Sequence, residues 1–202
     1  MTSVLVTGFE PFAGGVVNPS ELLVQALAAA PPDGVELATA VLPVSYARGA
    51  AVLAEAVRDA EPELVVCFGQ ADGRTGISVE RFALNVDDAG SADNDGAVSA
   101  AAPIDSGGPA AFRSSLPVDE IVAALRAGSI PAATSRDAGG FLCNHVFYVL
   151  MALLARELPE ARGGFVHVPL LPEQALAAPA ASMPLETLVR AGRILLATTL
   201  AQ

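Results

Sequence analysis

Short runs rich in valine, leucine and phenylalanine alternate along this chain with longer segments rich in alanine and leucine. Compact apolar runs bounded by turn residues are typical of buried strands, and longer runs with helical periodicity are typical of helices that pack on them. The alternation therefore predicts an α/β fold with a largely buried sheet. The expected strands are 3–7, 36–43, 63–69 and 164–168, and the expected helices are 19–30, 45–60, 117–127, 141–157 and 185–200.

Length and charge narrow the classes of protein further. The chain has 202 residues, of which 52% are hydrophobic, so we expect one domain over residues 1–202 with a sizeable core. Its net charge is −11, and its 11 lysines and arginines are scattered. Because nucleic acid is bound by basic surfaces, we expect no nucleic-acid partner.

Membrane insertion and secretion are also disfavoured by the sequence. The longest apolar run, 146–155, is far shorter than the roughly 20 residues that cross a bilayer. The start of the chain has no basic region of the kind that opens a signal peptide. Two cysteines, Cys67 and Cys143, are too few for a disulfide framework. We therefore expect a cytoplasmic protein with no membrane partner.

The segment 70–108 differs from the rest, because it is rich in glycine, aspartate, asparagine and serine. Only the stretch 77–86 within it has an extended pattern, so we expect hairpins and irregular loops here. A long loop of this kind is either functional or a flexible surface excursion, and its composition fits both.

Cys143 follows the double glycine Gly139-Gly140 at the point where a strongly apolar helical pattern begins. The first turn of a helix offers unpaired N–H groups and the positive end of the helix dipole, which stabilise a thiolate. Cys143 is therefore a candidate nucleophile. The alternative is a buried cysteine that behaves as a small apolar residue.

A nucleophilic thiol needs a base, and the chain has two histidines, His145 and His167. On a helix His145 points about 200° away from Cys143, which makes it a poor partner. His167 lies near the carboxyl end of an expected strand, where open α/β sheets bind their ligands. We therefore expect His167 to pair with Cys143. The same geometry argues against a zinc site, and we expect no metal or other cofactor.

The imidazole of such a pair is usually oriented by a carboxylate or an amide. Glu80 is a candidate, because in the extended stretch it shares a face with Ser78 and Phe82. The alternative is a solvated Glu80 beside Arg81. Other polar residues of the loop compete for the role, and spacing does not choose among them: Asn85, Asp87, Asp88, Asp93, Asn94 and Asp95.

The turn after the first strand, Thr7-Gly8-Phe9-Glu10-Pro11-Phe12-Ala13-Gly14-Gly15, matches no phosphate-binding motif and has no lysine. Instead, Phe9 and Phe12 lie beside glycines, as Phe141 does. These rings could wall a small apolar slot in which backbone groups provide the polar contacts. Ordinary core packing of the three rings is the alternative.

Several motifs together resemble one family, the pyroglutamyl peptidase I (pyrrolidone carboxyl peptidase) cysteine peptidases. They are VLVTGFEPFAGGVVNPS, VVCFGQADGR, ERFALNVDD, DNDG, GGPAAF, DAGGFLCNHVFY and GGFVHVPLLPEQ, in family order from residue 4 to about 174. The resemblance implies a three-layer α/β/α sandwich with a twisted mixed sheet, similar to phosphorylase and hydrolase folds. It also implies a cytosolic homo-oligomer, a dimer or a tetramer, that hydrolyses the N-terminal pyroglutamyl residue from peptides.

Carried over by position, the resemblance implies Cys143 as nucleophile, His167 as base and Glu80 as third member of the triad. The implied substrate-binding residues are Phe9, Phe12, Gly69, Gln70, Phe141 and Leu142, with the backbone around Gly69 and Gln70 contacting the lactam.

The chain departs from the family pattern at Ala13, at Asp72 and at Gly90-Ser91-Ala92, where relatives commonly carry Arg-Ile-Pro. The last departure leaves open an alternative, a catalytically impaired protein of the same fold that binds pyroglutamyl peptides or small molecules. A nucleoside phosphorylase-like transferase is a further alternative from fold alone, but we find no phosphate site for it.

Overall fold

The computed structural model describes residues 1–99, 101–176 and 180–202. A mixed sheet of six strands forms its middle layer, in the order β2-β1-β3-β8-β4-β7. Among these strands, β4 runs antiparallel to β8 and parallel to β7, and the other neighbours are parallel. The strands are β1 (Thr2–Phe9), β2 (Val35–Leu42), β3 (Leu64–Gln70), β4 (Ile77–Glu80), β7 (Ala132–Ser135) and β8 (Arg162–Val168).

The central strands are buried on both faces, which explains their continuous apolar runs. In β3 the first six residues are all buried, and in β8 the last six are. The edge strand β2 instead mixes buried, half-buried and exposed positions. A second, two-stranded sheet pairs β5 (Phe82–Leu84) with β6 (Ala111–Arg113).

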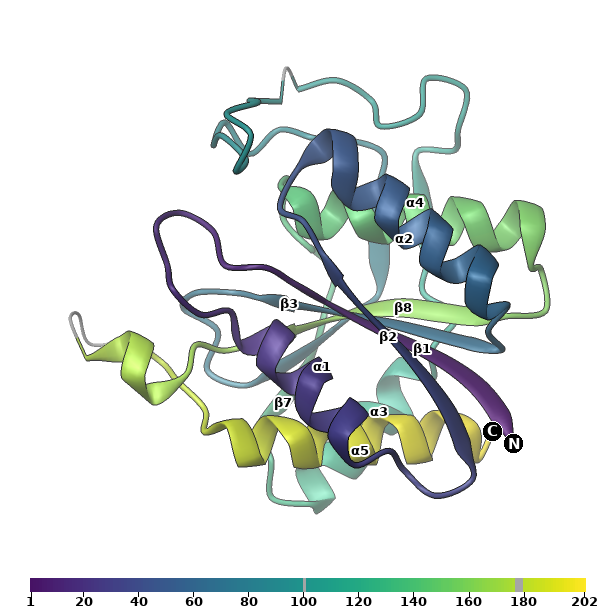
Figure 1. The fold of residues 1–202 in the computed structure, drawn as a ribbon, viewed down its shortest axis with the longest axis vertical. Helices are drawn as coiled ribbons and strands as arrows, with labels where there is room; N and C mark the ends of the chain where they lie inside the picture. Colours follow the sequence, from purple (N-terminus) through teal and green to yellow (C-terminus); the bar gives the residue numbers. More distant parts are fainter. Residues whose placement is uncertain (100, 177–179) are drawn as a thin grey trace.

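Helices cover both faces of the large sheet (Figure 1). The helices α1, α3 and α5 lie on one face, and α2 and α4 lie on the other. Their bounds are α1 (Pro19–Ala29), α2 (Tyr46–Ala60), α3 (Val118–Ala127), α4 (Leu142–Glu157) and α5 (Leu185–Leu200), with a short 3-10 helix, η1 (Pro172–Ala175). The expected three-layer α/β/α fold with a mixed sheet is confirmed.

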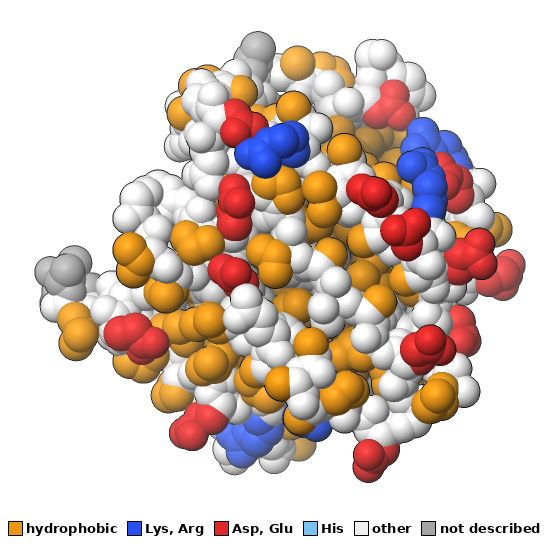
Figure 2. Space-filling model, in the orientation of Figure 1, with side chains coloured by type: hydrophobic (Ala, Val, Ile, Leu, Met, Phe, Trp, Pro, Cys, Tyr) orange, Lys and Arg blue, Asp and Glu red, His pale blue; other side chains and the backbone are white. Residues whose placement is uncertain are grey.

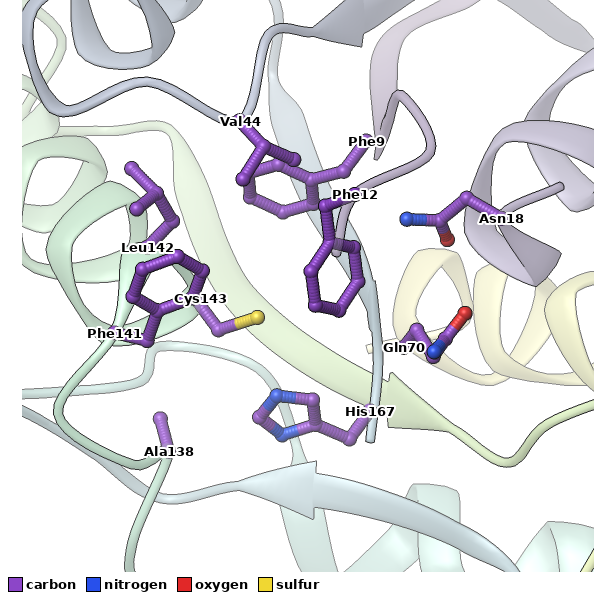
Figure 3. A pocket seen from close by; sticks show the side chains of 10 residues that line it. All are labelled: Phe9, Phe12, Asn18, Val44, Gln70, Ala138, Phe141, Leu142, Cys143 and His167. Carbon is purple, nitrogen blue, oxygen red and sulfur yellow. The ribbon is translucent and has the colours of Figure 1, made fainter. Parts of the chain in front are cut away.

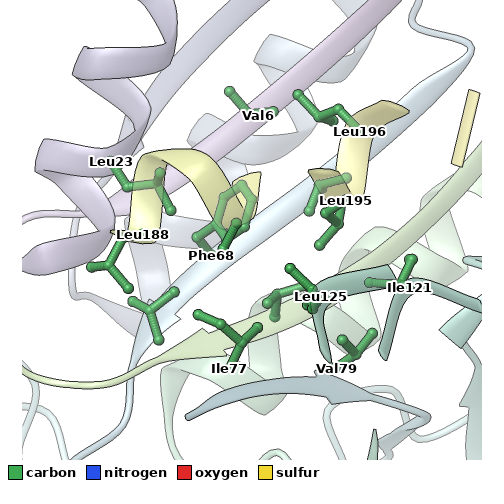
Figure 4. Close-up of a cluster of buried hydrophobic side chains, with 14 of the residues drawn as sticks. Val6, Leu23, Phe68, Ile77, Val79, Ile121, Leu125, Leu188, Leu195 and Leu196 are labelled. Carbon is green, nitrogen blue, oxygen red and sulfur yellow. The ribbon is translucent and has the colours of Figure 1, made fainter. Parts of the chain in front are cut away.

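Each face of the sheet has its own apolar core. Figure 4 shows the first, in which Leu23, Leu125 and Leu195 from three helices meet Val6 and Phe68 of the sheet. The second core packs α2 and α4 on the opposite face of the same strands. Helix starts follow local chemistry: the Asn18 side chain accepts a hydrogen bond from Ser20 N, and that of Ser45 accepts one from Arg48 N.

The stretch 77–86 is extended as expected, but it forms two strands that belong to different sheets. Its first part, β4, enters the large sheet between β8 and β7, and its second part, β5, pairs with the distant β6. Farther on, antiparallel bridges join Asp87 to Ala102 and Ala92 to Val98, so the chain there does fold back on itself as expected. Residue 100 of this segment lies outside the described residues. No helix in the described ranges is both long and apolar enough to span a membrane.

Candidate functional site

The parallel strands β1, β3 and β8 end at one edge of the sheet, and α4 begins there. A pocket of about 160 Å³ opens at this edge (Figure 3). An apolar cavity of roughly this size, about 150 Å³, holds a benzene ring in another protein. The pocket is therefore sized for a small ring. Its lining residues are Phe9, Phe12, Asn18, Val44, Gln70, Ala138, Phe141, Leu142, Cys143 and His167.

Cys143 is the second residue of α4 and lines the pocket. The first hydrogen bond within the helix runs from His145 N to Phe141 O, so the N–H groups of residues 142 to 144 precede it. Phe141 occupies the N-cap position and makes no side-chain cap. Gly139, with φ +81°, turns the chain into the helix. Backbone donors and the positive end of the helix dipole thus surround the sulfur.

Gly69 lies directly behind the Cys143 sulfur rather than on the pocket lining. A Cβ atom on Gly69 would lie 2.9 Å from Cys143 Sγ and 2.7 Å from Phe165 Cζ. Real Cβ atoms essentially never approach other atoms this closely. Glycine at this position therefore gives the sulfur its space.

His167 lies on β8, is 4% exposed, and faces the same pocket as Cys143 (Figure 3). Its Nδ1 is 2.8 Å from Glu80 Oε1, and the ring and the Cys143 side chain line the same pocket. Burial lowers the pKa of His167, but interactions of the ring with the Cys143 side chain and then with the Glu80 carboxylate outweigh burial and raise the pKa to about 9. The imidazolium form is favoured between these partners.

Glu80 ends strand β4 and is fully buried. The antiparallel register sets Ser78 opposite His167, which brings the carboxylate beside the imidazole. The guanidinium of Arg74 lies 3.5 Å from Glu80 Oε1 and donates to Asp137 O at 3.0 Å. The alternative of a solvated Glu80 is wrong, because its side chain has no exposed surface.

The residues that competed with Glu80 contact other groups. Asp87 lies 2.7 Å from Nδ1 of the other histidine, His145, and Asn94 donates to Glu10 Oε1 and Pro11 O. The Asp93 carboxylate accepts from backbone N–H groups, and Asp95 pairs with Arg48. Asn85 pairs with the backbone of Asp105, and Asp88 donates its N–H to Gly140 O.

The second cysteine is inert. Cys67 lies in β3 with no exposed surface, as the expected buried strand implied. Burial raises the pKa of the Cys67 thiol to about 12, so it stays protonated. Both cysteines are free thiols. In the described part of the chain, no group of three or more His, Cys, Asp or Glu side chains could hold a metal ion.

Aromatic rings form the walls of the pocket. Phe12 and Phe141 lie with ring centroids 6.3 Å apart, and Phe9 packs on Phe165 at 6.3 Å. The side chain of Gln70 donates to Asp72 and accepts from Gln174, which holds it at the rim. Phe9 is buried, whereas Phe12 and Phe141 are half-buried and face the cavity. Phe12 and Phe141 thus form walls of an apolar slot, as one alternative predicted, while Phe9 also packs in the core, as the other predicted.

Three lining residues were missed in the sequence: Asn18, Val44 and Ala138. Asn18 carried a signal, since its place before Pro19-Ser20 marks a helix N-cap, and it also donates to Glu10 O. Val44 and Ala138 are small apolar residues in loops. Nothing in their local sequence separates them from ordinary core residues.

Comparison with known proteins gives a consistent result. A family model described as pyroglutamyl peptidase matches residues 2–202. A pyrrolidone-carboxylate peptidase of Streptomyces coelicolor is 47% identical over 197 residues, which cover 98% of this chain and 91% of the relative. The crystal structure of pyroglutamyl peptidase I from Bacillus amyloliquefaciens matches with a TM-score of 0.97 at 40% identity, covering 100% of this chain and 98% of that chain.

A mutant pyrrolidone carboxyl peptidase of Pyrococcus furiosus matches with a TM-score of 0.96 at 34% identity, covering 99% of each chain. The resemblance seen in the motifs is confirmed over nearly the whole sequence. The chain belongs to the pyroglutamyl peptidase family.

Proposed function

We propose that the protein is a cysteine exopeptidase that hydrolyses the amide bond after an N-terminal pyroglutamyl residue. The observation that carries this proposal is the arrangement of Cys143, His167 and Glu80 at a ring-sized apolar pocket. Membership of the pyroglutamyl peptidase family supports the same substrate class.

Recognition follows from the chemistry of the pyroglutamyl ring. The lactam is neutral, so an acidic anchor for an N-terminal amine would find no partner. Phe12 and Phe141 cover the two sides of the slot, and the backbone at Gln70, which lines the pocket, pairs with the polar groups of the lactam. An N-terminal glutamate or glutamine would bring a charged amine into an apolar pocket, which costs several kcal/mol or more. Such peptides are therefore rejected.

In the first half of the reaction the Cys143 sulfur attacks the scissile carbonyl carbon and forms a tetrahedral oxyanion. His167 holds the proton of the thiol as imidazolium and gives it to the leaving amine as the C–N bond breaks. Pyroglutamyl thioester remains on Cys143. In the second half, His167 takes a proton from water, the resulting hydroxide attacks the thioester, and pyroglutamate leaves as the sulfur regains its charge.

The N–H groups at the start of α4 provide the site for the oxyanion. One such donor contributes roughly 3 to 4 kcal/mol of transition-state stabilisation in other enzymes. Glu80 keeps Nδ1 of His167 protonated and Nε2 directed at the sulfur. Each of the three side chains therefore has a separate duty.

The test is a fluorogenic pyroglutamyl amide given to wild type and to Cys143→Ala. We expect turnover by wild type and a loss of at least about 1,000-fold in the variant, with an unchanged melting temperature, because removal of the nucleophile abolishes covalent catalysis. Cys67→Ala is the matched control and is expected to retain turnover. Equal rates for wild type and Cys143→Ala would refute the assignment.

The alternative of an impaired binding protein rests on Gly90-Ser91-Ala92. These residues are exposed and do not line the pocket, so this departure removes no wall from it. The same assay separates the two functions, since a binding protein retains the substrate without releasing the amine.

We also propose a cytoplasmic homo-oligomer, a dimer or a tetramer, built from one domain per chain. Two free thiols are consistent with a reducing compartment. The assembly is measured by sedimentation velocity, in which a single monomeric species at micromolar concentration contradicts it.

A further inference from the structure

The ring of Phe141, one wall of the pocket, is backed by a second ring that does not reach the cavity. Tyr46, the first residue of α2, meets Phe141 edge to face, with centroids 5.7 Å apart and planes at 89°. On another side Tyr46 meets His145 in the same way, at 5.5 Å and 82°. Tyr46 thus lies between the pocket wall and the histidine that catalysis does not use.

His145 is in turn held by the polar loop. Its Nδ1 lies 2.7 Å from Asp87 Oδ2, and both side chains are nearly buried, at 13% and 12% exposed. The backbone of Asp87 is fixed by a hydrogen bond from its N–H to Ala102 O. The next two residues, Asp88 and Ala89, both donate their N–H groups to Gly140 O, beside Phe141.

The backbone at Phe141 does not fix its ring. This residue is the N-cap of α4 and has an extended backbone, with φ −105° and ψ −163°, so helical geometry does not set its side chain. Its front side faces the cavity and Phe12. Packing from behind, by Tyr46 and the second core, therefore holds the ring against a substrate.

From this geometry we infer that Tyr46, His145 and Asp87 are positioning residues that hold Phe141 against the pyroglutamyl ring and so set the fit of the pocket. The inference rests on the proposed function. None of the three lines the pocket or contacts His167 through the hydrogen bonds described. They act through Phe141, on substrate binding rather than on the chemical step.

The ring of Tyr46 and not its hydroxyl has this role. The hydroxyl is buried and has no hydrogen-bond partner among the described residues. An edge-to-face aromatic pair contributes through ring placement, and its loss costs on the order of 2- to 10-fold in an equilibrium constant. Tyr46→Phe keeps the pair, and Tyr46→Leu removes it.

The experiment measures KM and kcat for a pyroglutamyl amide in both variants. We expect Tyr46→Leu to raise KM about 2- to 10-fold with kcat within about 2-fold of wild type, and Tyr46→Phe to restore the wild-type KM. The rate at which iodoacetamide alkylates Cys143 should not change, because this small reagent needs no aromatic wall. A wild-type KM in Tyr46→Leu overturns the inference.

Phe112→Leu is the matched control. Phe112 of β6 packs on Tyr148 of α4, with ring centroids 5.0 Å apart, and does not line the pocket. The Phe112→Leu variant loses an aromatic contact with α4 but keeps the contact between Tyr46 and Phe141. We expect its KM to equal that of wild type, and an equal rise in KM for Phe112→Leu also overturns the inference.

A double-mutant cycle tests whether the pair of His145 and Asp87 contributes to holding Phe141. If Asp87 and His145 act as one unit, Asp87→Asn, His145→Gln and the double variant raise KM by similar factors, because either change alone breaks the pair. If the rise in KM of the double variant equals the product of the two single rises, the two residues act independently and this coupling is contradicted.

A binding measurement tests the positioning role even if the proposed peptidase activity is absent. If wild type releases no amine, the dissociation constant of a pyroglutamyl peptide is measured by calorimetry in Cys143→Ala with and without Tyr46→Leu. A 2- to 10-fold weaker affinity with Tyr46→Leu then supports the positioning role, and equal affinities overturn it.

Discussion

The His167 imidazole contacts the Glu80 carboxylate and lines the same pocket as the Cys143 sulfur. The pKa of His167 is raised to about 9 by interactions with the Cys143 side chain and with Glu80, against the opposing effect of burial. Because the pKa is raised, the imidazolium persists through neutral pH and is lost as the pH rises through about 9.

The activity should follow this titration. We expect kcat/KM for a pyroglutamyl amide to be nearly constant below the transition and to fall about 10-fold per pH unit above it, since the leaving amine then has no proton donor. A pH–rate profile in the free-enzyme regime measures this. A rate that stays constant to pH 10.5 would contradict the role of His167 as the acid.

Gly69 permits the sulfur of Cys143 to lie where it does. Gly69→Ala would put a methyl group 2.9 Å from Sγ and 2.7 Å from the Phe165 ring, so one of them must move. We expect kcat to fall at least 10-fold and stability to fall by about 1 to 3 kcal/mol. Enzyme assays and urea unfolding measure the two effects.

Gly107→Ala is the control for this substitution. A Cβ atom at Gly107 meets only Asp105 Oδ1, at an ordinary 3.7 Å. It should leave both activity and stability near the wild-type values. Full activity in Gly69→Ala would show that the sulfur does not depend on this space.

Sequence reasoning identified part of this site, and physical causes explain the rest. Cys143 and His167 carried local signals, a helix start and a strand end. Glu80 was marked only by its face in an extended stretch, because its contact with His167 spans 87 positions and depends on an antiparallel register that no local pattern encodes. Arg74, which supports Glu80, was overlooked for the same reason.

At the scale of elements, α4 supplies different side chains to different partners within one turn. Leu142 and Cys143 line the pocket, while Asn144, fully buried, faces β5. Its Oδ1 accepts from Leu84 N, and its Nδ2 donates to Leu84 O and Val86 O, each at 2.8 Å. This amide attaches the small sheet to α4.

Removing the amide should therefore destabilise the protein. Asn144→Ala leaves buried backbone groups without partners, and we expect a loss of about 3 kcal/mol of unfolding free energy in urea. Asn85→Ala is the control, since Asn85 binds the backbone of Asp105 at the surface and should cost about 1 kcal/mol or less. Equal losses for the two variants would contradict the importance of burial.

The elements themselves were predictable to differing degrees. All five long helices of the described residues were predicted, because apolar periodicity marks each of them locally and a side-chain cap also marks the start of α1 and of α2. Strand β7, with the sequence Ala-Ala-Thr-Ser, was missed, since small residues give no apolar alternation. The three-residue strands β5 and β6 become strands only through each other, so sequence periodicity could not reveal β6.

On the scale of the whole molecule, charge is spread rather than collected. Figure 2 shows carboxylates distributed over one face, with few lysines or arginines among them. With a net charge of −11, such a surface repels polyanions and leaves recognition to the apolar pocket. A neutral ring is a substrate that this field does not exclude.

The sheet is weakly joined at the point where its direction reverses. Strands β8 and β4 share two residue pairs, Ser78 with His167 and Val79 with Val166, whereas β3 and β8 share seven. Strand β4 and its outer neighbour β7 have four residues each. Local opening of β4 and β7 should therefore need less free energy than global unfolding.

Glu80 lies on the outer side of this junction and His167 on the inner side. We expect urea to abolish turnover at a lower concentration than it abolishes the helical circular dichroism signal, and amides of β4 and β7 to exchange hydrogen faster than those of β3. Coincident transitions and uniform protection would contradict this. If β4 and β7 do open first, the enzyme loses activity while the rest of the fold stays intact. Inactivation by mild denaturing conditions is then reversible.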